Sequence, residues 1–212
     1  MKREKISTAV IRRMPRYYRH VNELIESGAE RISSGALSKQ LGLTASQIRQ
    51  DFSCFGEFGL QGYGYNLKNL RNEIAEILGT TCNHKAILFG VGNLGRALIQ
   101  NFNFDQCGFD VIAAFDVLPE LVGTEINSVP ILHADQSIQY IREHRPDVAV
   151  LCVQQEYAGD VAAKLAAAGI SGIWNFTNLD LHLEGTGVAV ENIHFADSLL
   201  TLSYMISSGR EQ

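Results

Sequence analysis

Three glycines and one aspartate in the middle of the chain could together bind a dinucleotide. Residues 90–95 read Gly-Val-Gly-Asn-Leu-Gly, and Asp116 follows 21 residues after Gly95. In a G-x-G-x-x-G pattern the first glycine permits a tight turn and the second lets the backbone approach a pyrophosphate. The third glycine lets a helix pack closely on a strand. We therefore expect a cofactor contact at each residue of this stretch and at Asp116: Gly90, Val91, Gly92, Asn93, Leu94, Gly95 and Asp116.

Asp116 also indicates which dinucleotide is bound. A carboxylate at this position accepts hydrogen bonds from both ribose hydroxyls of an adenosine, and its charge repels a 2′-phosphate. No lysine or arginine follows it in the next residues, Val-Leu-Pro-Glu-Leu-Val-Gly. The sequence favours NADH and NAD+ over their phosphorylated counterparts.

The pattern around the glycines predicts a parallel sheet that helices cover on both faces. Near-continuous apolar runs predict strands, and amphipathic segments predict helices between most of them. The expected strands are 85–90, 110–116, 129–132, 147–153, 172–176 and 187–191. The expected helices are 94–102, 134–144 and 157–168, followed by an apolar terminal helix at 196–206. The fold class is α/β, with a Rossmann-like domain in the second part of the chain.

The second part of the chain has too few residues left over to form the substrate domain of a dehydrogenase. The expected strands use nearly every residue from Lys85 to Glu191, whereas dehydrogenases add a substrate domain that supplies acid and base groups. Four histidines follow the glycines, none in a catalytic or metal-ligand pattern: His133, His144, His182 and His194. We expect no catalytic residue. A small NAD-dependent oxidoreductase with an N-terminal dimerisation module stays open as an alternative, and a CoA-binding Rossmann module as a weaker one.

The first part of the chain predicts a winged helix-turn-helix. A helix with Pro15 in its first turn ends near Gly28, and Ser34 is expected to cap a short helix to Leu41. After a turn at Gly42, Thr44 and Gln47 form a capping-box pattern at the start of another helix. That helix turns Ile48 and Phe52 inward. The glycine-rich stretch 56–65 predicts a wing hairpin, and 67–78 predicts a last helix before a linker at 80–84.

The two parts differ in charge, as expected when only the first part meets DNA phosphates. Residues 1–80 carry 12 Lys+Arg and 8 Asp+Glu, whereas residues 81–212 carry 6 and 15. A basic front suits phosphate contacts. On the outer face of the second short helix, Arg49 could read guanine, and Gln47 and Gln50 could read adenine. A plain packing unit with a solvated face is the alternative for this segment.

Composition excludes other classes of protein. The four cysteines form no C-x-x-C pair, so we expect neither a metal site nor a disulfide framework. No apolar run approaches the length of a membrane helix, and no signal peptide precedes the first helix. We expect a cytoplasmic protein.

The whole chain resembles the Rex family of redox-sensing transcriptional repressors. The resemblance rests on ISSGALSKQLGLTASQIRQDFSCFGEFGLQGYGYN, LFGVGNLGRAL with AFD, and WNFT with NIHFADSLLTLSY. It implies a homodimer that represses genes for anaerobic NADH reoxidation, binds a palindromic operator, and is released by NADH. It also implies three parts: a DNA-binding domain at 1–80, a dinucleotide domain at 81–193, and a terminal helix at 194–212 that is exchanged in the dimer.

The resemblance adds site residues to those above. Further cofactor contacts are expected at Val153, Gln154, Asn175, Thr177 and Phe195, with Phe195 shielding the nicotinamide. The expected DNA contacts are Arg12, Arg16, Thr44, Ala45, Ser46, Gln47, Arg49, Gln50, Ser53, Gln61 and Tyr63.

Several positions depart from the family pattern. His194 stands where an aspartate is usual, and its expected switch partner is Arg19. Asn101 replaces a tyrosine, Gln50 replaces a lysine, and Gln61 replaces a basic residue. Val-Gln-Gln at 153–155 replaces Val-Pro. We expect operator preference and the switch contact to differ accordingly.

Overall fold

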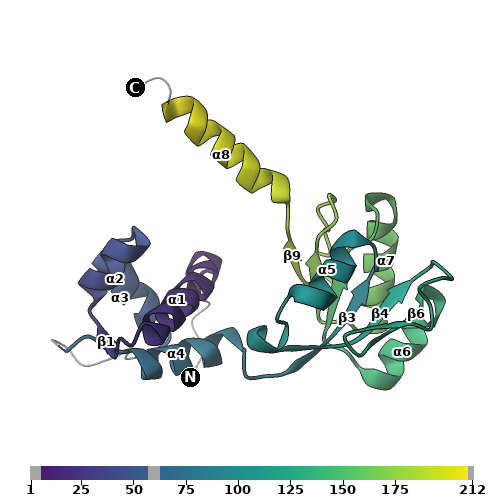
Figure 1. Ribbon diagram of the computed structural model, residues 1–212, viewed down its shortest axis with the longest axis horizontal. Helices are drawn as coiled ribbons and strands as arrows, with labels where there is room; N and C mark the ends of the chain where they lie inside the picture. The colour runs from purple at the N-terminus through teal and green to yellow at the C-terminus, as the bar shows by residue number, and fades with distance from the viewer. Residues whose placement is uncertain (1–5, 57–62, 210–212) are drawn as a thin grey trace. The chain divides into compact units, whose positions relative to one another are not determined.

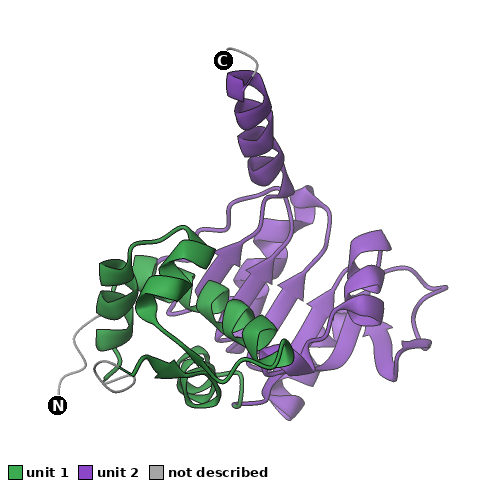
Figure 2. Cartoon of the chain, turned by 60° about the vertical axis from the view of Figure 1, so that its left-hand side comes forward, with its two compact units in different colours: residues 1–81 green, residues 82–212 purple. Residues whose placement is uncertain are grey.

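A computed structural model describes residues 6–56 and 63–209. The chain divides into two compact units, residues 1–81 and 82–212 (Figure 2). Each unit has its own hydrophobic core, as a domain that could fold independently requires. The two units are therefore described separately.

The first unit is helical, with one small ribbon. Its elements are α1 (Thr8–Glu26), β1 (Arg31–Ile32), α2 (Ser34–Leu41), α3 (Ala45–Ser53), β2 (Tyr65–Asn66) and α4 (Leu67–Leu78). Every helix begins at a residue whose side chain accepts a backbone N–H of the first turn: Ser7, Ser33, Thr44 and Asn66. Gly42 and Gly79 end α2 and α4 in the left-handed conformation. Local capping therefore sets the bounds of most of these helices.

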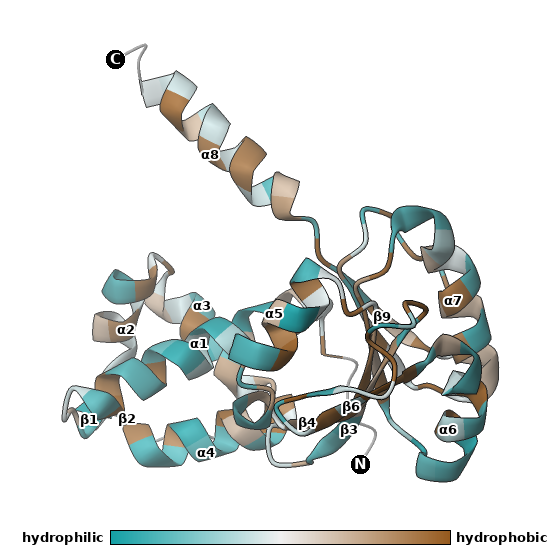
Figure 3. Cartoon of the chain, turned by 45° about the vertical axis from the view of Figure 1, so that its right-hand side comes forward, coloured by the Kyte–Doolittle hydropathy of each residue, from teal (hydrophilic) through white to brown (hydrophobic). Residues whose placement is uncertain are grey.

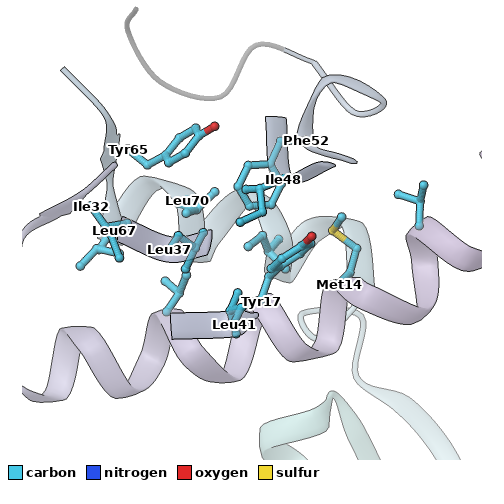
Figure 4. Close-up of a cluster of buried hydrophobic side chains, with 13 residues drawn as sticks. Met14, Tyr17, Ile32, Leu37, Leu41, Ile48, Phe52, Tyr65, Leu67 and Leu70 are labelled. Atoms are coloured by element: carbon cyan, nitrogen blue, oxygen red, sulfur yellow. The ribbon is translucent and has the colours of Figure 1, made fainter. Parts of the chain in front are cut away.

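One cluster of buried side chains holds this unit together (Figure 4). Ile48 and Phe52 of α3 are almost fully buried, as the sequence predicted. The Phe52 ring lies edge-on to Tyr17 of α1, with centroids 5.1 Å apart, and to Tyr65, at 5.3 Å. Helix α3 is thus fixed through one face, and its opposite face is left to solvent.

Two local expectations for this unit differ from the structure. Helix α1 begins after Ser7, so Pro15 lies in its interior rather than in its first turn. Because Ser33 already accepts the N–H of Ala36, it is the cap of α2, and Ser34 is the first helical residue. Strand β2 pairs antiparallel with β1. Most of the expected wing, including Gln61, lies outside the described residues.

The second unit is a seven-stranded sheet in the order β5-β6-β4-β3-β7-β8-β9. Figure 1 labels β3, β4, β6 and β9 of this sheet. Its strands are β3 (His84–Phe89), β4 (Phe109–Asp116), β5 (Glu125–Ile126), β6 (Val129–His133), β7 (Val148–Leu151), β8 (Gly172–Asn175) and β9 (Ala189–Asn192). All neighbours are parallel except β5 and β6. Without β5, this is the order of a doubly wound dinucleotide-binding sheet. The six expected strands are present with ends shifted by up to two residues, and β5 was not expected.

Helices cover both faces of this sheet. They are α5 (Asn93–Asn101), α6 (Ser137–His144) and α7 (Gln155–Ala168), with short 3-10 turns η1 (Asp105–Cys107) and η2 (Ala134–Gln136). Ile99 of α5 packs with Leu88 on one face, whereas Leu165 of α7 packs with Ile87 on the other. The side chains of successive residues of β3 therefore belong to different cores.

The connection from β8 to β9 contains no helix, and an apolar cavity of about 390 Å³ lies in this part of the sheet. The last element, α8 (Phe195–Gly209), has no buried residue. Apolar residues recur along it (Figure 3), with Leu199, Leu200, Leu202 and Met205 at least half exposed. Within the described ranges, no helix is both long and apolar enough to cross a membrane.

Candidate dinucleotide site and DNA-recognition helix

The glycine-rich turn lies between β3 and α5, as its pattern predicts. Gly90 has φ +89°, and a Cβ on it would lie 2.6 Å from the Cys152 carbonyl oxygen of the neighbouring strand connection. A Cβ on buried Gly95 would collide with the Gly90 carbonyl oxygen. Both glycines are therefore required by the packing of the protein itself.

Gly92 is different, because nothing in the protein requires a glycine there. Its φ is −70°, and a Cβ at this position would meet no atom within 4 Å. Gly92 is also the N-cap of α5, and no side chain caps that helix. The first-turn N–H groups and the open space beside them fit a pyrophosphate, which binds well at a helix N-terminus.

Asp116 ends β4 and fixes the glycine-rich turn. One carboxylate oxygen, Oδ2, accepts the N–H of Val91 at 2.6 Å. The other, Oδ1, accepts the N–H groups of Val117 at 2.8 Å and of Leu118 at 3.0 Å. Asp116 thus links the ends of β3 and β4 and stays partly exposed at the place expected for an adenosine ribose.

A cavity of about 480 Å³ lies at this edge of the sheet. Five of the expected cofactor residues line it: Gly90, Gly92, Asp116, Val153 and Gln154. Sequence reasoning missed other lining residues, among them Val117, Leu118, Ser137 and Tyr157. The exposed apolar pair directly after Asp116 was the available signal, because Val117 is 65% exposed and Leu118 45%. These two side chains give the cavity an apolar wall beside Asp116.

The remaining expected cofactor residues do not line this cavity. Val91 and Leu94 lie in the glycine-rich turn and the first turn of α5, and Asn93 is exposed there. Asn175 and Thr177 are buried, and they bond to each other: Asn175 Oδ1 accepts from the Thr177 N–H at 3.0 Å and from its hydroxyl at 2.7 Å. Phe195 is 61% exposed, and its ring lies 6.0 Å from Phe176.

Cys152, which lies at the candidate dinucleotide site, is an unreactive thiol. Cys152 lines the cavity, and burial raises the pKa of its thiol to about 12. A thiol with such a pKa stays protonated near neutral pH and is a poor nucleophile. All four cysteines are free, and among the described residues no group of three His, Cys, Asp or Glu could hold a metal ion.

The outer face of α3 presents a mixed polar surface. Thr44, Ser46, Arg49, Gln50 and Ser53 are exposed, and Ala45 is half-buried. Arg49 Nη1 donates to the Ser34 hydroxyl of α2 at 3.0 Å, which holds its guanidinium beside α2. The capping box is only half formed, because Gln47 N–H bonds to Thr44 Oγ1 whereas the Gln47 amide donates to Asp51. Gln47 is therefore anchored to its own helix.

Asp51 is a buried carboxylate with three donors. Arg13 donates to both of its oxygens, Tyr17 donates its hydroxyl at 2.7 Å, and Gln47 donates its amide at 2.9 Å. Burial alone would raise the pKa of Asp51, but these hydrogen bonds together outweigh it and lower the pKa below its ordinary value. Sequence reasoning missed this group, whose only signal was a charge on the inward side of α3.

The expected phosphate contacts lie on α1 and after the wing. Arg12 and Arg16 are exposed, and Arg16 also donates to the Leu41 carbonyl at the end of α2, at 2.6 Å. Tyr63 is 74% exposed. These side chains and the outer face of α3 belong to the same unit, which therefore exposes both cationic and hydrogen-bonding polar groups.

The two expected switch residues lie in different units. Arg19 is exposed on α1, and His194 directly precedes α8. His194 Nε2 lies 2.8 Å from Asp180 Oδ1, and this hydrogen bond raises the pKa of the imidazole, opposed by a smaller effect of burial. His194 therefore has an acidic partner in its own unit.

Comparison with known proteins covers both units. Residues 5–53 match the family model described as "Putative DNA-binding protein N-terminus", and residues 81–179 match the one described as "CoA binding domain". The redox-sensing transcriptional repressor Rex of Clostridium novyi is 46% identical over 97% of this chain and 98% of its own. The Rex of Clostridium tetani is 45% identical over 99% of both chains.

Solved structures agree with this comparison. The crystal structure of RSP in complex with β-NAD+ and operator DNA has a TM-score of 0.90 and 41% identity, over 98% of this chain and 95% of that one. The structure of RSP in complex with β-NADH also has a TM-score of 0.90, with 38% identity over 98% and 97% of the two chains. On this full-length similarity, the chain belongs to the Rex family of redox-sensing transcriptional repressors.

Proposed function

We propose that this protein binds a palindromic operator as a homodimer and is released from it by NADH. The observation that carries the proposal is the presence, in one chain, of an exposed helix-turn-helix face and of a glycine-rich turn with Asp116. The full-length relatives are named as repressors, and solved relatives contain operator DNA, β-NAD+ or β-NADH. The oxidoreductase alternative is therefore not favoured.

In this proposal the three parts of the chain have separate roles. Residues 1–80 contact DNA, with Ser46, Arg49 and Gln50 facing the bases and Arg12 and Arg16 facing phosphates. Residues 81–193 bind the dinucleotide, whose pyrophosphate lies at the N-terminus of α5 and whose adenosine ribose lies at Asp116. Because Asp116 is a carboxylate, we expect NADH and NAD+ rather than their 2′-phosphorylated forms.

Residues 194–212 would form the dimer contact. Helix α8 exposes a run of large apolar side chains that a lone chain leaves in water, and exposed apolar patches of this kind mark interaction surfaces. Exchange of α8 between two subunits would bury them. The proposal needs no metal ion and places the protein in the cytoplasm, where operator DNA and the dinucleotide pool are both present.

The physical basis of release is linkage. NADH can lower operator affinity only by binding more tightly to a dimer arrangement whose recognition helices no longer match two half-sites. A coupling free energy of about 1–3 kcal/mol would change operator affinity roughly 5–150-fold.

The test is a mobility-shift titration on an operator selected from random duplexes by this protein. NADH and NAD+ are titrated separately, and we expect NADH to release the duplex at lower concentration. Unchanged operator affinity at saturating NADH would contradict the proposal.

The "CoA binding domain" match is tested with Asp116→Ala, because a variant that binds NADH as tightly as wild type would favour a CoA-type ligand.

A further inference from the structure

One amide oxygen joins the loop after β8 to the segment that enters α8. Asn192 Oδ1 accepts Nδ2–H of Asn175 at 2.8 Å and the backbone N–H of Leu181 at 3.2 Å. Asn175 is the last residue of β8, and Leu181 lies in the connection that leads from β8 to β9. Asn192 is the last residue of β9, only three positions before Phe195, where α8 begins.

The side chain of Asn175 restricts movement of the loop after β8. It is fully buried, and its Nδ2 also donates to the Leu179 carbonyl at 2.7 Å. Its Oδ1 already accepts two hydrogen bonds from Thr177. All the polar capacity of its side chain is thus used within the loop and at Asn192. A shift of the loop would therefore break buried hydrogen bonds or carry Asn192 with it.

Further contacts join the same two segments. The Ile193 N–H donates to the Asn175 carbonyl at 2.8 Å, and His194 pairs with Asp180 of the loop at 2.8 Å. The ring of Phe176 lies 6.0 Å from that of Phe195. We use the term β8–α8 clasp for the contacts of loop residues 175–181 with residues 192–195.

The clasp lies at the ligand edge of the sheet. Strand β8 is the parallel neighbour of β7, whose carboxyl end leads directly into Val153 and Gln154 of the dinucleotide cavity. Ligands of doubly wound sheets bind outside the carboxyl ends of the strands. The clasp therefore connects this edge to the helix whose apolar residues are exposed for a partner.

We propose that Asn192 is a positioning residue that couples dinucleotide occupancy to the position of α8. This inference rests on the proposed function, and nothing in it requires Asn192 to touch the ligand. Occupancy shifts the loop 176–181, and Asn192 carries that shift to α8. Without the shared acceptor, the loop and α8 are joined less tightly, so the dinucleotide still binds but releases DNA less effectively.

The experiment separates binding from coupling. Full-length wild type, Asn192→Ala and Asn192→Asp are compared, with Thr186→Ala as the matched control. Thr186 lies in the same connection, and its hydroxyl bonds to Leu183 instead of to the clasp. The readouts are NADH affinity by fluorescence, and operator affinity by anisotropy without NADH and at saturating NADH. The ratio of the two operator affinities measures the coupling.

We expect NADH affinity within about threefold of wild type in every variant, because Asn192 lies outside the cavity. Wild type and Thr186→Ala should show a ratio of roughly 5–150. In Asn192→Ala the ratio should fall well below that of wild type, towards the value of one that means no coupling, while the Ile193 and His194 contacts of the clasp remain. Asn192→Asp keeps an acceptor oxygen for Asn175 and Leu181 and should retain most of the ratio.

A wild-type ratio in Asn192→Ala overturns this inference and leaves the proposed function intact, whereas a wild-type protein that ignores NADH overturns both. Hydrogen exchange of the wild-type Leu181 amide provides a measurement that does not depend on a folded variant. NADH should change its protection. Identical exchange with and without NADH, in protein that NADH releases from DNA, overturns the coupling role.

Discussion

Arg13 and Asp51, 38 residues apart in the sequence, join α1 to α3 through two parallel hydrogen bonds. Arg13 Nε lies 2.6 Å from Oδ2, and Nη2 lies 2.7 Å from Oδ1. Asp51 is fully buried, whereas the Arg13 side chain is 27% exposed. Helix α3 is thus held by a charge pair as well as by the buried side chains of Ile48 and Phe52.

Arg13→Ala should destabilise the first unit by about 3 kcal/mol, because it leaves a buried carboxylate without its cation. Chemical denaturation followed by circular dichroism measures the change. A double variant, Arg13→Met with Asp51→Leu, should recover part of the loss, since no unpaired charge remains. If the single variant is as stable as wild type, the pair does not stabilise the fold.

Acidification should lower the stability of the first unit, because Asp51 becomes protonated. Its folded pKa lies below the unfolded value of about 3.9, so its contribution is complete above that value and is lost as pH falls through the folded pKa. The denaturation midpoint of wild type should therefore drop below about pH 4. Asp51→Asn should be less stable at neutral pH, with a flatter acid profile. Parallel profiles for the two proteins would contradict the assignment.

Gly92→Ala and Gly95→Ala should affect different properties, although both alter the glycine-rich turn. A Cβ at Gly92 meets no protein atom, so the variant should keep its thermal stability and lose at least about tenfold in NADH affinity, or roughly 1.4 kcal/mol. A Cβ at Gly95 meets the Gly90 carbonyl and should destabilise by about 1–3 kcal/mol. Calorimetry and NADH fluorescence check both. If Gly92→Ala binds NADH as tightly as wild type, the pyrophosphate does not bind at this turn.

Arg49→Ala should weaken operator binding while NADH affinity stays unchanged. Loss of one bidentate contact to a base is worth about 1–3 kcal/mol, or roughly 5–150-fold in affinity. Arg71→Ala removes the same charge from α4 and is the control, because the Arg71 guanidinium bonds to Asn72 of its own helix. Anisotropy at constant salt measures both variants. Equal losses would mean that net charge, rather than base reading, explains the effect.

His194 should titrate above its ordinary pKa of about 6.5, because its ring bonds to Asp180. A raised folded pKa means that the pair stabilises the protein fully below the unfolded pKa and that this is lost as pH rises through the folded value. NMR titration should show the His194 pKa falling in Asp180→Asn. It should not move in Glu184→Gln, since Glu184 pairs with His182. If the His194 pKa is the same in Asp180→Asn as in wild type, the two side chains do not pair in solution.

The sequence predicted correctly the elements whose ends are set by capping residues next to them in the chain. Helix α4 has the expected bounds because Asn66 caps it and Gly79 ends it. Pro15 was misplaced for a tertiary reason: Val10 and Met14 pack in the core, so α1 extends N-terminally past the proline. The edge strand β5 has two residues and no period to detect.

The candidate site was predictable where backbone conformation demands a residue type. Gly90, Gly95 and Asp116 follow from the turn and its packing. Asn175 and Thr177 are expected to contact the cofactor, and the structure shows them at the end of β8 and in the loop that follows, bonded to each other. A side chain's hydrogen-bond partner there depends on the path of the loop, and no local pattern encodes that path.

The apolar cavity beside the helix-free connection from β8 to β9 gives this molecule an internal optical probe. The chain has a single tryptophan, and Trp174 lines that cavity with Phe102 and Phe104. Indole emission shifts with the polarity around the ring, so we expect a change in polarity beside Trp174 to shift this emission band. Movement of the strands and side chains that line the cavity could thus be timed in unlabelled protein by stopped-flow emission.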